Sequence, residues 1–342
     1  MAMKVLVTGA TGFIGSHLVR ELLAQGAEVR ALCRPRRDWK TLAHLPVEVV
    51  EGDITDLRSL REALRGVKQV YHAAALYALW APARRWFYEV NIAGTRNVLE
   101  AAWEAGVERV VYTSTHATVG VAEDPTLPVD ESRPFNRWKF SNEYVRSKAL
   151  AEQEVAKFVA AGLPVVIVNP TAPIGPGDHK PTPTGEFLVR LLNGQLRFYI
   201  DAQVNFVHVR DVARGHLLAM ERGRPGERYL LGGTNTSVRK VIHLVREIAG
   251  DVPRCFQVPG AVAVAAGYLG EAWSKLTGRR PPVDAGSIKF LLRCPPVDSR
   301  RAVAELGLPQ TPLEEALREA IAWYRDQGYL RKAGEDRPKR SR

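Results

Sequence analysis

The 342-residue chain contains only three cysteines, Cys33, Cys255 and Cys294, and they lie far apart. Their spacing matches no metal-ligand motif, so we expect no metal site. A few widely separated cysteines are typical of reduced thiols, which predicts a cytoplasmic protein.

Long hydrophobic runs are also missing. The most apolar stretch, VPGAVAVAAGYLG from Val258 to Gly270, is about a dozen residues and too short to cross a bilayer. We expect a buried helix there rather than a contact with a membrane surface. The first apolar run, VLV, is too short for a signal peptide, and glycines follow it at once. The sequence therefore predicts no stable membrane insertion.

Acidic residues are too few to balance the basic ones, and the formal net charge is +11. Part of the excess lies in RKAGEDRPKRSR, residues 331–342, which has almost nothing to bury and is predicted to be a disordered basic tail. Elsewhere, basic and aromatic residues are not interleaved as in proteins that bind single strands. We therefore expect no nucleic-acid partner.

Short β-rich runs alternate with helical patterns up to about Asn169. The predicted strands are KVLVTG, EVRALCR, VEVVEGD, QVYHAAA, RVVYTST and PVVIVNP. Helical patterns at 16–26 and 95–106 each end at a glycine, as many helices do. Val- and Ile-rich strands that alternate with helices indicate a parallel sheet covered on both faces. The predicted fold class is α/β, with a Rossmann-type doubly wound sheet.

The alternation stops after Asn169, where NPTAPIGPGDHKPTPTG is dense in Pro and Gly and is predicted to be loop. We expect a dinucleotide-binding domain at 1–170, to which 204–233 returns. Residues 171–203 and 234–330 are then a smaller mixed α/β lobe that binds substrate.

Three glycines, Gly9, Gly12 and Gly15, stand between the first strand and the first helix. The first permits the tight turn, the second lets a pyrophosphate approach, and the third lets the helix pack close to the strand. The helix N-terminus offers N–H groups to phosphates, and Thr11 can add a hydroxyl. Because strand and helix flank the turn, it predicts a dinucleotide site rather than an ordinary turn.

The end of the second strand bears on the choice of dinucleotide. An NAD site usually has Asp or Glu there, whereas this sequence has CRPRRD, with Arg34 at that end and Asp38 too far along. A guanidinium suits a 2′-phosphate, although a solvated basic loop is the plainer alternative. We expect NADP, with NAD as the alternative. Asp53, which ends the third strand, can accept from the adenine amino group.

The motif YVRSK places Tyr144 and Lys148 four residues apart on one face of a helix that begins near Ser141. A phenol with a pKa of ~10 is a poor base at neutral pH. The Lys148 ammonium and an oxidised nicotinamide would lower the pKa of Tyr144. Tyr144 would then exchange a proton with a substrate oxygen while hydride moves at carbon. A Tyr and a Lys at this spacing also occur together by chance, so a pair without function on the helix surface is the alternative.

Together these motifs resemble the extended short-chain dehydrogenase/reductases, the NAD-dependent epimerase/dehydratase family, over nearly the whole chain. The elements in family order are the glycine turn, Asp53-Ile54, HAAA at 72–75, Asn91, TST at 113–115 and YVRSK. The resemblance implies that Thr115 hydrogen-bonds the substrate oxygen beside Tyr144, where relatives more often have Ser. It also implies that Lys148 holds the nicotinamide ribose, and that the protein is a homodimer formed through the Tyr144 helix.

The resemblance also implies a set of cofactor-binding positions: Gly9, Thr11, Gly12, Phe13, Ile14, Gly15, Arg34, Asp53, Ile54, Ala73, Ala74, Ala75, Tyr144, Lys148, Pro170 and Pro173. Within the family, LYALWAP and NPTAPIGPGDHKPTPTG are most similar to the dihydroflavonol-4-reductase-like branch. The subgroup named hopanoid-associated sugar epimerases is the most similar part of that branch.

We expect a small-molecule substrate between the carboxyl edge of the sheet and the smaller lobe. An anionic or an isoprenoid- or sugar-linked substrate is favoured, the anionic one if basic residues cluster there. The candidate contacts are Tyr77, Trp80, His116, His179, Lys180, Thr182, Thr184 and His208. A core role is the alternative for Trp80, and a structural role is the alternative for each histidine.

Three functions fit these residues: an NADP-dependent reductase or dehydrogenase, a sugar epimerase that retains NAD, and a non-catalytic dinucleotide sensor. The intact Thr115, Tyr144 and Lys148 argue against the sensor. His116 and Ala117 follow TST where a sugar dehydratase would have acidic residues, which argues against dehydration. Arg34 favours the reductase, whereas the name of the similar subgroup favours the epimerase.

Overall fold

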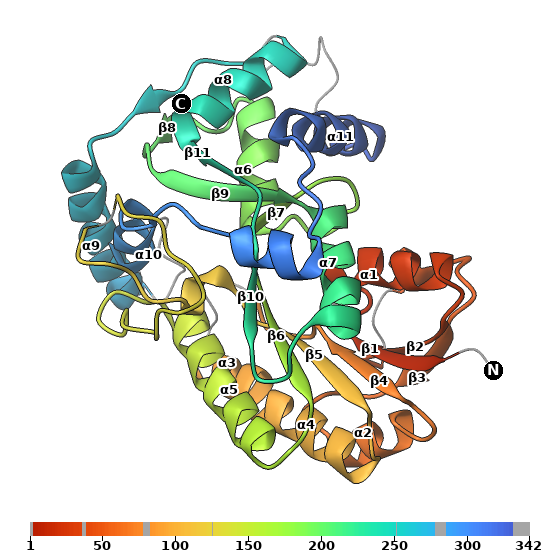
Figure 1. The fold of residues 1–342 in the computed structure, drawn as a ribbon. Helices are drawn as coiled ribbons and strands as arrows, with labels where there is room; N and C mark the ends of the chain where they lie inside the picture. Colours follow the sequence, from red (N-terminus) through yellow and green to blue (C-terminus); the bar gives the residue numbers. More distant parts are fainter. Residues whose placement is uncertain are drawn as a thin grey trace.

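The computed structural model describes residues 3–35, 39–77, 83–124, 126–250, 252–277 and 285–330. A larger lobe built on a parallel sheet carries a smaller lobe beside the carboxyl ends of its strands (Figure 1). The predicted tail at 331–342 lies outside the described residues. Along the described chain, no helix combines the length and the apolar character needed to cross a bilayer.

The larger lobe contains a sheet of seven strands in the order β10-β6-β5-β4-β1-β2-β3, with all neighbours parallel. The strands are β1 (Lys4–Thr8), β2 (Glu28–Cys33), β3 (Glu48–Glu51), β4 (Gln69–His72), β5 (Arg109–Thr113), β6 (Val165–Pro170) and β10 (Arg228–Leu231). All six strands expected from the sequence are present, so the predicted doubly wound fold is confirmed. The order reverses between β1 and β4, and such a switch point is where these folds bind ligands.

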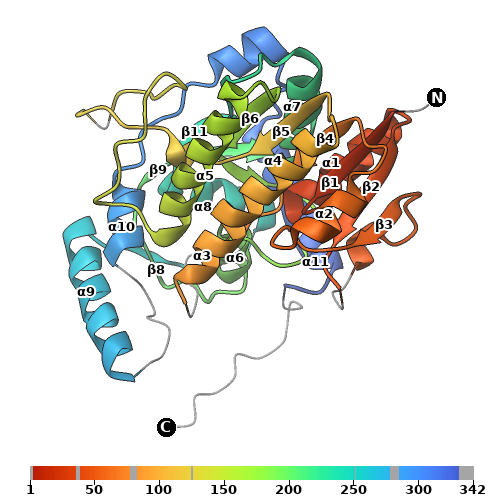
Figure 2. The same ribbon diagram turned by 90° about the horizontal axis from the view of Figure 1, so that it is seen from below.

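Helices cover both faces of this sheet (Figures 1 and 2). One face carries α1 (Phe13–Ala24) and α7 (Val209–Arg222), and the other carries α2 (Leu57–Ala63), α4 (Gly94–Glu104) and α5 (Glu143–Ala160). The alternation of side chains along β1 builds both cores, because Val5 and Val7 face the first helices and Leu6 faces the second set.

Short helical turns join these elements. They are the 3-10 turns Lys40–Leu42 and His116–Thr118, the one-turn helix α3 (Arg85–Tyr88), and the π turns Glu89–Ala93 and Ala302–Leu306. The helices α1 and α4 are followed by Gly26 and Gly106 at positive φ, as expected from the sequence.

The smaller lobe combines two small sheets with five helices among the described residues. A three-stranded sheet has the order β11-β9-β7, and β12 pairs with β8. The strands are β7 (Ala172–Ile174), β8 (Phe198–Tyr199), β9 (Gln203–His208), β11 (Thr234–Ser237) and β12 (Phe256–Gln257). The helices are α6 (Pro183–Leu192), α8 (Val238–Ala249), α9 (Gly260–Thr277), α10 (Ala285–Leu292) and α11 (Leu313–Asp326). The core of this lobe lies between α6, α8, α11 and the three-stranded sheet.

The segment predicted to be loop after Asn169 contains regular structure. Ala172–Ile174 forms β7, an edge strand in which Pro173 is tolerated. Pro183 then starts α6 in the first turn, where a proline costs no hydrogen bond. Within 204–233, α7 and β10 lie with the large sheet, whereas β9 pairs with β7 and β11.

The expectation of a buried helix around Val258–Gly270 is wrong. The helix α9 is exposed along one whole side, where Leu269 and Leu276 are 73% and 87% exposed. Apolar residues occur on every side of this helix, so the sequence does not tell the covered side from the open one. In the structure α10 packs against one side and leaves the other to solvent.

Candidate active site

The glycine turn between β1 and α1 is closed by backbone contacts. Gly9 has a φ of +73°, and Gly12 N donates to Gly9 O at 2.9 Å. A Cβ on Gly9 would lie 2.7 Å from Ala74 N, and a Cβ on Gly15 would lie 2.1 Å from Gly9 O. Neither position has room for a side chain, so both must be glycine.

This turn also forms the N-terminus of α1. The N-cap is Gly12, which supplies no side-chain acceptor to the first-turn N–H groups. Those groups have no partners within an α-helix. A cradle of free N–H groups with no Cβ above it fits the pyrophosphate of a dinucleotide. Thr11, Phe13 and Ile14 lie on the same turn.

The end of β4 is held against the turn by His72, which is fully buried. Thr8 Oγ1 donates to His72 Nδ1 at 2.8 Å, and His72 Nε2 donates to Thr95 Oγ1 at 3.1 Å. The Thr95 hydroxyl donates onward to Asn91 O at 2.7 Å, which fixes this tautomer. Burial lowers the pKa of His72 to about 3, so the ring is neutral. Ala74 N donates to Thr8 Oγ1 at 3.2 Å, which holds the segment after β4 in place.

Thr115 and Tyr144 meet where β5 ends and α5 begins. Asn142 caps α5 by accepting from Val145 N at 3.0 Å, so Tyr144 lies in the first turn. The Thr115 hydroxyl lies beside the Tyr144 phenol, where it acts to lower the pKa of that phenol. Thr115 Oγ1 also accepts from Ala117 N at 3.3 Å, which leaves its proton for the phenol oxygen.

Lys148 lies one turn further along α5 and is 1% exposed. Its Nζ donates to Tyr112 OH at 2.7 Å and to Thr113 O at 2.8 Å. Burial lowers the pKa of Lys148 to about 7, although the Glu152 carboxylate opposes this shift. Sequence reasoning missed Tyr112, because nothing in a strand pattern marks one tyrosine as the partner of a lysine.

Burial also governs the acidity of Tyr144. Its enclosure raises the pKa of Tyr144 above the ordinary value; Tyr77 adds to the rise and the nearby Thr115 hydroxyl opposes it. The expected lowering by Lys148 is absent in the structure, because Lys148 directs its ammonium to Tyr112. The phenol is therefore protonated at neutral pH.

A buried polar network supports the loop that carries Thr115. Glu152 Oε1 accepts from Thr118 Oγ1 at 2.6 Å, from Asn169 Nδ2 at 2.9 Å and from Ser114 Oγ. Asn169 Nδ2 also lies 3.0 Å from Thr115 O. Sequence reasoning missed this network, although Glu152 stands four residues after Lys148 and so lies on the same side of α5.

Asn91 connects the segment after β4 to α5. Its Oδ1 accepts from Leu76 N at 2.7 Å, and its Nδ2 donates to Ser147 Oγ at 2.9 Å. Asn91 lies in the π turn Glu89–Ala93, and such turns are frequent at functional sites.

The residues expected to select the dinucleotide follow β2 and β3. Arg34 is exposed directly after β2, and Trp39 Nε1 donates to its carbonyl oxygen at 3.4 Å. Asp53 Oδ1 accepts from Thr55 N at 2.9 Å and from Thr55 Oγ1 at 2.8 Å. Ile54 fits against Gly94, on which a Cβ would lie 2.7 Å from Ile54 Cδ1.

Two of the candidate substrate residues border Tyr144 and Thr115. The ring centroid of Tyr77 lies 5.0 Å from that of Tyr144. His116 follows Thr115 directly, and its Nδ1 is 3.4 Å from Pro170 O at the end of β6. Burial lowers the pKa of His116 to about 4, so the imidazole is neutral and Nδ1 is the donor.

The other candidate substrate residues have mostly structural contacts. Thr182 caps α6 and donates to Asp178 Oδ2 at 2.8 Å, and the His179 ring packs edge-on against Trp323 on α11. His208 caps α7, and its Nε2 lies 3.1 Å from Glu319 Oε2. Lys180 is exposed before α6, Thr184 is half-buried in its first turn, and Trp80 lies outside the described residues. Within the described ranges, no group of His, Cys, Asp and Glu side chains is arranged to hold a metal ion.

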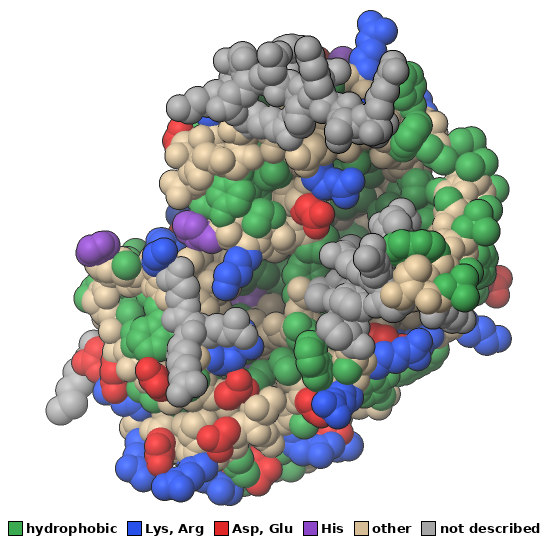
Figure 3. Space-filling model, turned by 180° about the vertical axis from the view of Figure 1, so that it is seen from behind, with side chains coloured by type: hydrophobic (Ala, Val, Ile, Leu, Met, Phe, Trp, Pro, Cys, Tyr) green, Lys and Arg blue, Asp and Glu red, His purple; other side chains and the backbone are tan. Residues whose placement is uncertain are grey.

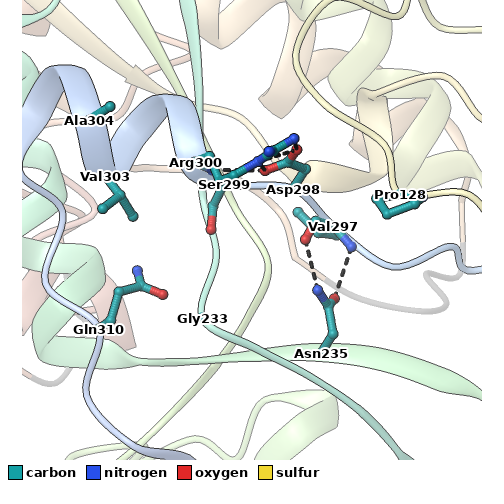
Figure 4. Close-up of a pocket in the computed structure, with 10 residues that line it drawn as sticks. All are labelled: Pro128, Gly233, Asn235, Val297, Asp298, Ser299, Arg300, Val303, Ala304 and Gln310. Carbon is teal, nitrogen blue, oxygen red and sulfur yellow. Dashed lines mark hydrogen bonds and ion pairs between the residues drawn. The ribbon is translucent and has the colours of Figure 1, made fainter.

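A separate crevice of about 640 Å³ lies between β11 and the segment at 297–304 (Figure 4). Its polar side chains are largely paired. Asn235 exchanges two hydrogen bonds with the Val297 backbone, and Arg300 is bound to Asp298. None of the residues that line this crevice belongs to the candidate site, so we place the chemistry at Thr115, Tyr144 and Lys148 instead.

Comparison with known proteins agrees with this geometry. The model of the NAD dependent epimerase/dehydratase family matches residues 5–232. A putative dihydroflavonol 4-reductase of Synechocystis is 40% identical, with 97% of each chain covered. Sterol demethylase protein B of Methylococcus capsulatus is 36% identical over 96% of this chain and 100% of its own.

Among solved structures, a dTDP-glucose 4,6-dehydratase from Streptomyces venezuelae with NAD bound superposes with a TM-score of 0.76. It is 28% identical and covers 96% of this chain and 99% of its own. The predicted resemblance and its dihydroflavonol-reductase-like branch are thus confirmed. The chain belongs to the NAD dependent epimerase/dehydratase family of extended short-chain dehydrogenase/reductases, and it is an enzyme of the oxidoreductase and epimerase kind.

Proposed function

We propose that the protein is an NADP(H)-dependent reductase or dehydrogenase that interconverts a carbonyl group and a secondary alcohol, with Tyr144 as the acid/base. The observation that carries the proposal is the placement of the Thr115 hydroxyl beside the Tyr144 phenol, one helical turn from the buried Lys148. These three groups lie at the carboxyl edge of the sheet that also carries the glycine turn.

The glycine turn, the first turn of α1 and Ala73–Ala75 would hold the pyrophosphate, and Pro170 and Pro173 would border the nicotinamide. Arg34 would bind the 2′-phosphate, Asp53 and Ile54 the adenine side, and Lys148 the nicotinamide ribose. When bound, the nicotinamide supplies or accepts the hydride. The absence of a side chain at Gly9, Gly12 and Gly15 supports this fit.

Tyr144 is well placed as a proton donor in the reductive direction. Burial keeps its phenol protonated, and Thr115 can hold the same substrate oxygen through its own hydroxyl. Lys148 shares a hydrogen bond with Tyr112 OH, so its ammonium adds positive charge beneath the site.

The substrate class follows from the neighbours of Tyr144. Tyr77 offers an aromatic face, and the neutral His116, which donates its N–H to Pro170 O, offers an Nε2 acceptor; together they suit an apolar or polycyclic alcohol. The relative named sterol demethylase protein B supports the same class. The alternative is a sugar epimerase that retains NAD, which the family name and the NAD-bound dehydratase favour. A homodimer through α5 remains our prediction.

The test is the Tyr144→Phe variant. It is compared with Tyr329→Phe, a matched control in the smaller lobe. We expect the first variant to lose at least ~10²-fold in turnover of secondary alcohols by NADP, since an acid/base is removed. Its affinity for NADP, measured by fluorescence, should stay within a few-fold of wild type. Unchanged turnover would refute the mechanism. NAD that stays bound through purification, with no net reduction, would establish the epimerase instead.

A further inference from the structure

The outer side of α9 is an apolar stripe composed of Val262, Ala265, Ala266, Leu269, Trp273 and Leu276. These residues recur at intervals of three and four, so they lie along one line of the helix. Leu276 is 87% exposed and Leu269 is 73% exposed. Among the described side chains on α9, none on this side is charged. Such an arrangement reverses the usual one, in which the apolar side of a helix faces the core.

The opposite side of α9 is fixed to the protein. A Cβ on Gly267 would lie 2.7 Å from the Ala285 backbone, so the two helices α9 and α10 are in close contact there. Glu271 Oε1 accepts from Ala285 N at 2.9 Å, which turns the acidic side chain of α9 inward. The helix stands at the edge of the molecule (Figure 2), and the exposure of the stripe residues places the stripe on its outer side. Figure 3 shows hydrophobic side chains gathered along this edge.

Aromatic rings and cations border the apolar stripe. Lys289 Nζ lies 4.7 Å from the ring centroid of Tyr268 on α9, which is 52% exposed. The Arg293 guanidinium lies 4.2 Å from the ring centroid of Phe140, and Trp138 beside it is 40% exposed. Trp and Tyr with Lys or Arg beside an apolar face is the composition that anchors proteins at a membrane interface.

A second copy of the chain does not fit the stripe as well. A helix of this length measures ~27 Å and is about 10 Å wide, so two facing stripes would bury only roughly 500–600 Å², below the ~1,200 Å² of a stable interface. A lipid surface needs no matching partner, and its phosphates complement the two cations. We propose that the apolar stripe docks this protein on the surface of an anionic bilayer, with Lys289 and Arg293 facing lipid phosphates.

Docking would also orient the candidate active site. Trp138 and Phe140 lie just before Asn142, which caps the helix that carries Tyr144. An apolar substrate that leaves the bilayer beside α9 would thus emerge close to that helix. The docking itself rests on α9 and its neighbours and not on the proposed reaction.

The experiment uses the full chain and vesicles of phosphatidylcholine, with or without phosphatidylglycerol, separated by flotation. We expect wild type to bind the anionic vesicles and the variant L269E/L276E to bind at least ~10-fold more weakly, since two exposed leucines that would enter the bilayer become charges. The control M3E/V303E makes the same charge change at exposed apolar positions outside α9. It should bind like wild type. Circular dichroism and NADP affinity verify that all three are folded.

Three results would overturn the proposal. They are no binding by wild type, equal binding by all three proteins, and a wild-type dimer that L269E/L276E converts to a monomer in light scattering. A second measurement does not depend on the folding of the glutamate variant. Brominated acyl chains should quench part of the wild-type tryptophan fluorescence, and Trp273→Phe should reduce that quenched part. Quenching that is undiminished in Trp273→Phe would count against insertion of the stripe.

Discussion

The Lys148 ammonium lies 2.7 Å from the phenolic oxygen of Tyr112, inside the protein and one turn of helix from Tyr144. Because burial lowers the pKa of Lys148 to about 7, this charge is present below neutrality and is lost as the pH rises. The proposed mechanism needs the charge, so the activity acquires a pH dependence at Lys148.

We therefore expect kcat/KM for carbonyl reduction to fall as the pH rises through about 7. Lys148→Arg should abolish this alkaline limb, because a guanidinium keeps its proton at every accessible pH. Its maximal rate should be lower than that of wild type. The measurement is the pH profile of kcat/KM for both proteins. An identical limb in Lys148→Arg would assign the titration to another group.

Glu152 should be a positioning residue. Its carboxylate accepts from three side chains and raises the pKa of Lys148. Glu152→Gln should lower the free energy of unfolding by about 1–3 kcal/mol and move the alkaline limb to lower pH. Glu100→Gln, at a half-buried surface position on α4, is the control and should do neither. A loss of stability without movement of the limb would limit Glu152 to a purely structural role.

Arg34 should set the preference for NADP. Charge-assisted hydrogen bonds to a phosphate are worth about 1.5–3 kcal/mol, so Arg34→Asp should weaken NADP binding at least ~10-fold. Binding of NAD should be unchanged or tighter. Arg58→Asp makes the same charge change at an exposed site on α2 and should not change the ratio of the NADP and NAD affinities. Isothermal titration with both dinucleotides measures the ratio, and an unaltered ratio in Arg34→Asp would contradict this assignment.

Substitutions at two glycines of the turn should have different effects, one on the stability of the fold and the other on NADP binding. A Cβ on Gly15 would lie 2.1 Å from Gly9 O, so Gly15→Ala should lower the free energy of unfolding by about 1–3 kcal/mol. At Gly12 the nearest atom is 3.1 Å away and φ is −80°. Gly12→Ala should therefore keep the fold and weaken NADP binding at least ~10-fold. Denaturant unfolding and titration distinguish the two, and equal affinity of Gly12→Ala and wild type would argue against pyrophosphate at this turn.

The periodicity of the sequence predicted the large sheet well, because strands such as β1 are apolar on both faces and the helices α1 and α4 are each followed by a glycine. It failed at α9, where apolar residues on every side leave the covered side undetermined. The strand β7 was missed because Pro173 and the prolines on either side of the strand indicate loop, and only pairing with β9 makes it a strand.

The candidate site was predictable to the extent that it depends on short motifs. The glycine turn and the pair Tyr144 and Lys148 are local in sequence, and the structure brings Thr115 to the same place. The contacts that set the charge of Lys148 are not local: Tyr112 comes from β5, and Asn169, from β6, completes the Glu152 network. Such contacts depend on how α5 packs on the sheet, which a linear pattern does not encode.

The bare backbone of Gly9 has one more effect. Since it rests directly on Ala73 and Ala74, the two segments beneath the expected coenzyme are already locked together before it arrives. Binding of the coenzyme then has to order little of the backbone around Gly9 and Ala73–Ala74, so less affinity is lost to conformational entropy.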